Sequence, residues 1–258
     1  MMKTLIVGNW KMHLNTHDAS LLVKRLNDQI KTQRSVDVVL APNMLVLQPI
    51  SLEIDRRKFG LAAQNAYSVD EGAYTGEVSF TMLRDLVDYV IVGHSERRIY
   101  FNESNDVIRD KIQASVRNEI SPILCVGETK QEKLQHETRR VIHDQVTTAL
   151  ANLTSEEIDK VVIAYEPVWA ISTFQGEQAK PSDIEPIFEL IRSIVSDLYG
   201  HQVAENLRLL YGGSVTSDTV SGYLKIRGCN GALVGGASIN YKEFSGIVEQ
   251  AYALKNKA

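Results

Sequence analysis

Short apolar, β-rich runs alternate with segments of helical periodicity along the whole chain, and this alternation constrains the fold more than any other feature. There are eight such runs, at residues 5–8, 36–41, 59–63, 89–92, 120–126, 161–165, 207–211 and 232–234. Strands that alternate with helices predict right-handed βαβ units and a parallel sheet. Eight repeats in a chain of 258 residues favour a closed (β/α)8 barrel over an open sheet.

Two further sequence features support a single α/β barrel domain over residues 1–258. No Gly-x-Gly-x-x-Gly follows the first run, which weakens a dinucleotide-binding alternative. No Ser-, Gly- or Pro-rich linker divides the chain. Helix starts are expected at two capping boxes, Thr154 with Glu157 and Ser182 with Glu185.

Composition excludes several classes of protein. The net charge of −4 argues against nucleic-acid binding as the main activity. The amino-terminal apolar stretch is too short for a signal peptide, and no run approaches a membrane span. The two cysteines, Cys125 and Cys229, provide neither a disulfide framework nor zinc-ligand spacing, and we assign no role to Cys229. We expect a cytoplasmic protein with no metal, membrane or nucleic-acid partner.

Polar residues and glycines follow the apolar runs, and a parallel barrel would bring them together because all its strands end on the same side. They are Asn9, Lys11, Gln64, Asn65, His94, Glu96, Glu166, the 212–214 turn and the 235–238 turn.

Glu166 is the most informative of these residues. It ends a β-branched run, and Pro167, which has no N–H, stops the strand directly after it. A carboxylate at the carboxyl end of a buried strand is where α/β enzymes place catalytic groups. The alternative is that Glu166 only marks the point where the strand meets water.

The glycine turns after the last two runs indicate a phosphate site. Without Cβ atoms, the backbone N–H groups at Gly212-Gly213-Ser214 and Gly235-Gly236 can close on an anion. The alternative is that these glycines only form tight turns. Two such turns on neighbouring strands favour a phosphorylated substrate.

Glu166, His94 and Lys11 together suggest proton abstraction next to a carbonyl group. The carboxylate can take the proton, the imidazole can donate a hydrogen bond to the carbonyl oxygen, and the ammonium can stabilise the oxyanion. Alone, His94 could be structural and Lys11 could be a Schiff-base nucleophile.

Seven motifs at matching separations resemble the triosephosphate isomerase family over essentially the whole chain. They lie at residues 8–12 (GNWKM), 72–77 (GAYTGE), 93–98 (GHSERR), 125–128 (CVGE), 164–171 (AYEPVWAI), 211–215 (YGGSV) and 231–238 (GALVGGAS). The resemblance implies a TIM barrel that interconverts dihydroxyacetone phosphate and glyceraldehyde 3-phosphate without cofactor or metal.

The resemblance also implies a role for each site residue. Glu166 would be the base, and His94 a neutral electrophile at a helix start. Lys11 and Asn9 would steady the substrate and the enediolate, and Glu96 would pair with Lys11. Backbone amides would hold the phosphate at Ser172, Ser214, Gly235 and Gly236. A homodimer is implied, in which the 74–77 loop of one subunit inserts into its neighbour close to Asn9 and Lys11.

The chain departs from the family pattern in the lid that follows Glu166. Ser172 and Phe174 stand where the family has glycines, and Gly176 is a candidate hinge residue. The altered lid leaves open an isomerase of a four-carbon ketose phosphate. A non-catalytic binding or scaffold protein would require loss of a reacting group, yet Glu166, His94 and Lys11 are all present.

Overall fold

Eight parallel strands close into a barrel in the computed structural model, which describes residues 2–31, 34–171 and 178–255. The strands are β1 (Thr4–Asn9), β2 (Val36–Ala41), β3 (Phe59–Ala63), β4 (Tyr89–Val92), β5 (Ser121–Val126), β6 (Val162–Tyr165), β7 (Arg208–Tyr211) and β8 (Cys229–Val234). Each pairs with its neighbour in sequence, and β8 pairs with β1. The predicted (β/α)8 barrel is therefore confirmed, and each of the eight predicted runs coincides with a strand to within a few residues at either end.

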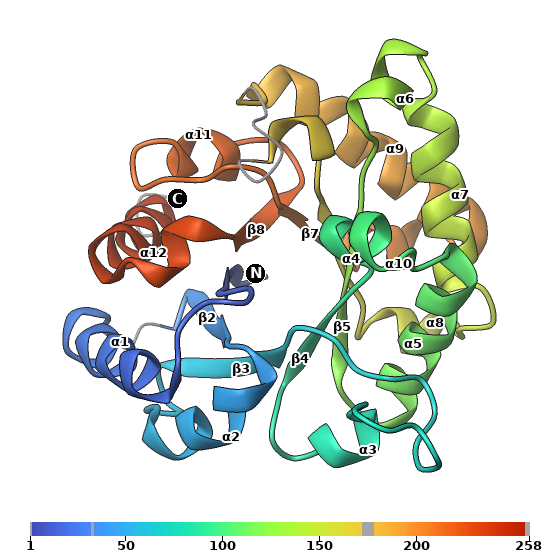
Figure 1. Ribbon diagram of the computed structural model, residues 1–258. Coiled ribbons are helices and arrows are strands. Elements are labelled where there is room, and N and C mark those ends of the chain that lie inside the picture. Colours follow the sequence, from blue (N-terminus) through green and yellow to red (C-terminus); the bar gives the residue numbers. More distant parts are fainter. Residues whose placement is uncertain (1, 32–33, 172–177, 256–258) are drawn as a thin grey trace.

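Helices lie outside the ring of strands (Figure 1). In chain order they are α1 (Thr16–Gln29), α2 (Met44–Glu53), α3 (Phe80–Leu83), α4 (Ser95–Tyr100), α5 (Asn105–Arg117), α6 (Lys130–Leu134), α7 (Thr138–Leu150), α8 (Ser155–Ile158), α9 (Pro181–Tyr199), α10 (His201–Asn206), α11 (Val220–Leu224) and α12 (Tyr241–Lys255). Two short 3-10 helices, η1 (Val168–Ala170) and η3 (Gly236–Ile239), follow β6 and β8. None of the helices in the described part of the chain is long and apolar enough to cross a membrane.

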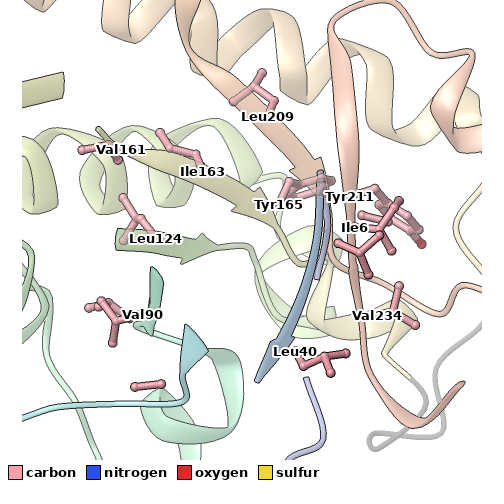
Figure 2. Close-up of a cluster of buried hydrophobic side chains, with 14 of the residues drawn as sticks. Ile6, Leu40, Val90, Leu124, Val161, Ile163, Tyr165, Leu209, Tyr211 and Val234 are labelled. Carbon is pink, nitrogen blue, oxygen red and sulfur yellow. The ribbon is translucent and has the colours of Figure 1, made fainter. Parts of the chain in front are cut away.

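The apolar core has two layers because successive residues of a strand point to opposite faces of the sheet. The smaller cluster consists entirely of strand residues, such as Leu5, Val7 and Leu233, and so fills the barrel interior. The larger cluster combines strand residues such as Ile6 with the buried faces of the helices. Figure 2 shows members of this outer layer on several strands. Both faces of every strand are therefore buried, as the continuous apolar runs predict.

Barrel closure depends on a close approach between β8 and β1. Leu5 pairs with Gly231, and a Cβ atom on Gly231 would lie 1.9 Å from the Leu5 carbonyl oxygen. Such a distance is far inside van der Waals contact, so a glycine is required at this point of the seam.

One of the two predicted helix caps is confirmed. Thr154 and Glu157 form a reciprocal capping box at the start of α8. The prediction at Ser182 is wrong, because α9 begins at Pro181 and the Lys180 N–H donates to the Asp183 carboxylate at 2.9 Å. Proline suits the first position of a helix, where its missing N–H would have no helical partner.

Candidate active site

A pocket of about 190 Å³ lies at the carboxyl-terminal end of the barrel. It is lined by Asn9, Lys11, His94, Glu166, Ile171, Gly212, Gly213, Ser214, Val215, Thr216, Leu233, Gly235, Gly236 and Ala237. Seven of the predicted site residues are among them. Glu96 lies behind Lys11 and does not line the pocket, and Ser172 falls outside the described residues.

Glu166 stands directly after β6 with only 2% of its surface exposed. Its Oε2 atom accepts a hydrogen bond from the Ser95 N–H at 3.0 Å, and its Oε1 atom lies 3.1 Å from Nε2 of His94. Gly212 makes this position possible, because a Cβ atom there would lie 2.7 Å from the Glu166 Cγ atom. The buried carboxylate is thus held by polar contacts from His94 and Ser95, which follow β4, and by the close approach of Gly212, which follows β7.

His94 is the N-cap residue of α4, and its ring accepts a hydrogen bond at Nδ1 from the Glu96 N–H at 3.2 Å. A ring nitrogen that accepts a hydrogen bond carries no proton. The single proton of the neutral imidazole is therefore on Nε2, the atom that faces Glu166. The position of His94 at a helix start agrees with the expectation from the sequence.

Lys11 reaches the pocket from the segment that follows β1. Its backbone has a φ of 53°, a left-handed conformation that non-glycine residues adopt mainly where the surroundings impose it. Two hydrogen bonds hold the Lys11 backbone in this conformation. The Asn9 Oδ1 atom accepts from the Lys11 N–H at 3.0 Å, and the Gln64 Nε2 atom donates to the Lys11 carbonyl oxygen at 2.9 Å. The Lys11 ammonium binds Glu96 at 2.6 Å, so the predicted ion pair is present.

The two glycine turns also line the pocket, with Gly212 beside Glu166 and Gly235 beside Lys11. The Ser214 hydroxyl donates to the Ala170 carbonyl oxygen at 3.1 Å, which ties the turn after β7 to the segment after Glu166. Gly236 begins the 3-10 helix η3. Backbone N–H groups in such turns can surround an anion, and the Lys11 ammonium, which lies beside Gly235, would add a positive charge.

A buried polar cluster supports the chain just beyond Glu166. Glu128, 1% exposed, accepts hydrogen bonds from the Trp169 indole at 2.9 Å and from the Tyr165 hydroxyl at 3.1 Å. Burial raises the pKa of the Glu128 carboxyl, and these donors oppose that change. The Lys133 ammonium lies 3.1 Å from the centre of the Trp169 ring.

Both cysteines are free thiols, and Cys125 lies inside the barrel. Burial raises the pKa of the Cys125 thiol, with a further contribution from the nearby Glu166 carboxylate. Burial likewise raises the pKa of Cys229 to about 11. Thiols of this kind are poor nucleophiles at neutral pH because little thiolate is present.

Several pocket residues were not identified by sequence reasoning. Leu233 and Ile171 are apolar residues that line the pocket, and in the sequence they cannot be told apart from other buried core residues. Ser95 does not line the pocket but donates its backbone N–H to Glu166, and a backbone contact of this kind leaves no trace in the residue type. Among the described residues, no group of three or more His, Cys, Asp or Glu side chains could hold a metal ion.

The fold and the pocket together define a (β/α)8-barrel enzyme, in which a buried carboxylate, an imidazole, an ammonium group and two glycine turns line one pocket. The family model described as triosephosphate isomerase matches residues 4–251. Triosephosphate isomerase from Clostridium tetani is 45% identical over 248 residues, which cover 95% of this chain and 96% of that protein. The protein of the same name from Carboxydothermus hydrogenoformans is 41% identical over 250 residues, covering 96% and 99%. The chain belongs to the triosephosphate isomerase family, and it is an isomerase.

Proposed function

We propose that the enzyme interconverts dihydroxyacetone phosphate and D-glyceraldehyde 3-phosphate through an enediol(ate) intermediate. The observation that carries this proposal is the buried Glu166 carboxylate, 3.1 Å from Nε2 of His94, in a pocket that two glycine turns also line. The names of the relatives agree with this substrate pair.

In the proposed mechanism, Glu166 removes a proton from the carbon next to the carbonyl group. His94 donates a hydrogen bond from Nε2 to the carbonyl oxygen as negative charge develops on it, and the Lys11 ammonium stabilises that charge. Glu166 then returns the proton to the neighbouring carbon, while the proton of the adjacent hydroxyl group passes to the former carbonyl oxygen, so the reaction is redox-neutral overall. Asn9 and Glu96 act by holding Lys11 in its strained conformation and in its ion pair.

The phosphate group is proposed to bind between the turns after β7 and β8. Backbone N–H groups of the lining residues Ser214, Gly235 and Gly236 are proposed to bind it, and Ser172 is proposed to add another from the lid. The pocket volume of about 190 Å³ suits a small substrate of this size. We also propose that the enzyme serves glycolysis and gluconeogenesis in the cytoplasm, and its two free thiols fit a reducing compartment.

A coupled assay with glyceraldehyde 3-phosphate and with tetrose phosphates tests the proposed reaction. We expect brisk triose turnover, and a loss of about 10²- to 10⁴-fold in kcat for Glu166→Gln because a general base is removed. Negligible triose turnover with brisk tetrose turnover would instead assign the site to a four-carbon ketose phosphate. Absence of turnover on either substrate would indicate a binding protein.

We also propose a homodimer formed through the loop of residues 74–77. A second groove of about 550 Å³ adjoins the active site and shares Asn9, Lys11 and His94 with it. Large apolar side chains on this face are exposed, including Met12 at 93% and Phe101 at 65%. Exposed apolar clusters of this kind mark surfaces that another protein covers. The 74–77 loop, exposed on the same subunit, is proposed to fill the groove of a second copy.

A further inference from the structure

The side chain of Gln145 makes two hydrogen bonds to a single residue beside the catalytic carboxylate. Its Oε1 atom accepts from the Gly127 N–H at 2.8 Å, and its Nε2 atom donates to the Gly127 carbonyl oxygen at 3.1 Å. Gln145 projects from the buried face of α7, and Gly127 directly follows β5. Reciprocal bonding of this kind satisfies both backbone groups of Gly127.

The sheet itself leaves these two groups unpaired. On the β6 side, Glu166 donates to Val126 at 2.7 Å and Val168 donates to Glu128 at 3.1 Å, so the backbone groups between them point the other way. On that other side, β4 ends at Val92, opposite Leu124. The Gln145 amide therefore takes the place of a β4 residue. It extends the hydrogen bonding along β5 beyond the point where β4 ends.

The position of Gly127 is coupled directly to that of Glu166. A Cβ atom on Gly127 would lie 1.8 Å from the Glu166 carbonyl oxygen, so the two backbones are in contact. Any shift of Gly127 toward β6 displaces the peptide that carries the catalytic side chain. Any shift away opens the hydrogen bonds at Glu166 and Val168.

We propose that Gln145 is a positioning residue for catalysis, which holds the Glu166 backbone in place through Gly127. The inference rests on the proposed role of Glu166 as the base. Gln145 does not line the pocket and has no contact with the substrate position, so it acts only through geometry. A displacement of about 1 Å at a reacting group can reduce the rate by about 100-fold.

The test compares Gln145→Leu with Gln145→Glu in the full-length enzyme. Gln145→Leu removes both hydrogen bonds, and we expect kcat to fall by about 10- to 100-fold while KM changes by less than about threefold. Gln145→Glu keeps an acceptor but has a donor only when its carboxyl is protonated. Its kcat relative to that of the wild type is therefore expected to rise as the pH is lowered.

Gln113→Leu is the matched control. Gln113, on α5, also donates from Nε2 to a backbone carbonyl oxygen, that of Ala151 at 3.2 Å, and neither residue lines the pocket. We expect its kcat to stay within about twofold of the wild-type value, even if its thermal stability falls.

A folded Gln145→Leu variant with kcat within twofold of the wild-type value would overturn the inference and leave Gln145 a structural residue. If that variant does not fold, a Gln145→Glu variant with a pH-independent kcat ratio close to one overturns it instead. Wild-type enzyme without triose turnover would refute the proposed function, and the inference with it. Active wild type with an unaffected Gln145 series refutes only the inference.

Discussion

At the scale of the residue, steric contact decides which side chains the catalytic centre accepts. Gly212 has no chemistry of its own, yet it allows β7 to approach the Glu166 side chain. Its missing Cβ atom would lie 2.7 Å from the Glu166 Cγ atom. The glycine turn therefore serves two purposes, because it also forms part of the pocket wall proposed to bind phosphate.

Gly212→Ala is expected to reduce kcat about tenfold or more, because the added methyl group displaces the carboxylate from His94. Steady-state assays on the purified variant provide the measurement. Gly222→Ala is the control, since a Cβ atom on Gly222 has no neighbour within 4 Å. Equal activity of Gly212→Ala and the wild type would show that Glu166 tolerates the shift.

Ionisation of Cys229 makes the stability of the protein depend on pH in the alkaline range. Burial raises its pKa to about 11, whereas a thiol in the unfolded chain ionises near pH 8.5. Below about pH 8.5 the thiol is protonated in both the folded and the unfolded protein, and its contribution to the free energy of unfolding is complete. Between about pH 8.5 and 11 the unfolded chain loses its proton first, so the free energy of unfolding falls as the pH rises.

Cys229→Ala should therefore show a smaller loss of stability than the wild type between pH 8.5 and 10.5. Urea unfolding at several pH values measures the free energy of unfolding of both proteins. The contributions of all other titratable groups are the same in the two proteins and cancel in the difference. If the free energy of unfolding depended on pH in the same way in both proteins, this would contradict the raised pKa of the Cys229 thiol.

At the scale of the element, the β8–β1 seam leaves no room for a side chain at Gly231. Gly231→Ala would place a methyl group 1.9 Å from the Leu5 carbonyl oxygen. The strands must separate to accommodate it, with an expected cost of about 3 kcal/mol in the free energy of unfolding. Urea unfolding at neutral pH measures it, and Gly222→Ala in α11 should cost nothing. A stability change below about 1 kcal/mol would show that the seam can relax.

The short helix α6 contributes to the support of Trp169 through one cation. The Lys133 ammonium lies over the indole ring whose N–H is bound by Glu128, so the ring is held at its face and its edge. Lys133→Met should lower the free energy of unfolding by about 0.5–1 kcal/mol. Lys130→Met, an exposed change on the same helix, should have no measurable effect by the same unfolding assay. Identical losses for the two variants would point to a general charge effect.

At the scale of the whole molecule, the proposed homodimer depends on the exposed 74–77 loop and on the apolar groove beside the active site. Thr75→Arg would bring a bulky cation into that groove, and burying an unpaired charge is costly. We expect sedimentation velocity to show a dimer for the wild type and a monomer for the variant at micromolar concentration. Gln202→Arg adds the same charge on the exposed surface of α10 and should remain dimeric. A monomeric wild type would refute the proposed assembly.

Most of the architecture and much of the site could be predicted from the chain alone. Each strand is buried on both faces and so appears in the sequence as a run of apolar residues. Because parallel strands all end on one side, the residue after each run is a site candidate, and the structure brings Lys11, His94 and Glu166 to one pocket. Helix starts were less predictable, since Pro181 competes with Ser182 for the same position. That residues 1–258 form one domain stays a prediction.

The sequence by itself determined the barrel, because the alternation of strands and helices is a local pattern, and its motifs identified the isomerase family. The strand ends also marked Lys11, His94 and Glu166 as residues of one pocket. Only the tertiary structure decided which backbone groups hold those side chains. The Ser95 N–H at Glu166 and the Gln145 amide at Gly127 join elements far apart in the chain. Such contacts depend on how each helix packs over the strands and on where each strand ends relative to its neighbour, and no local pattern records either.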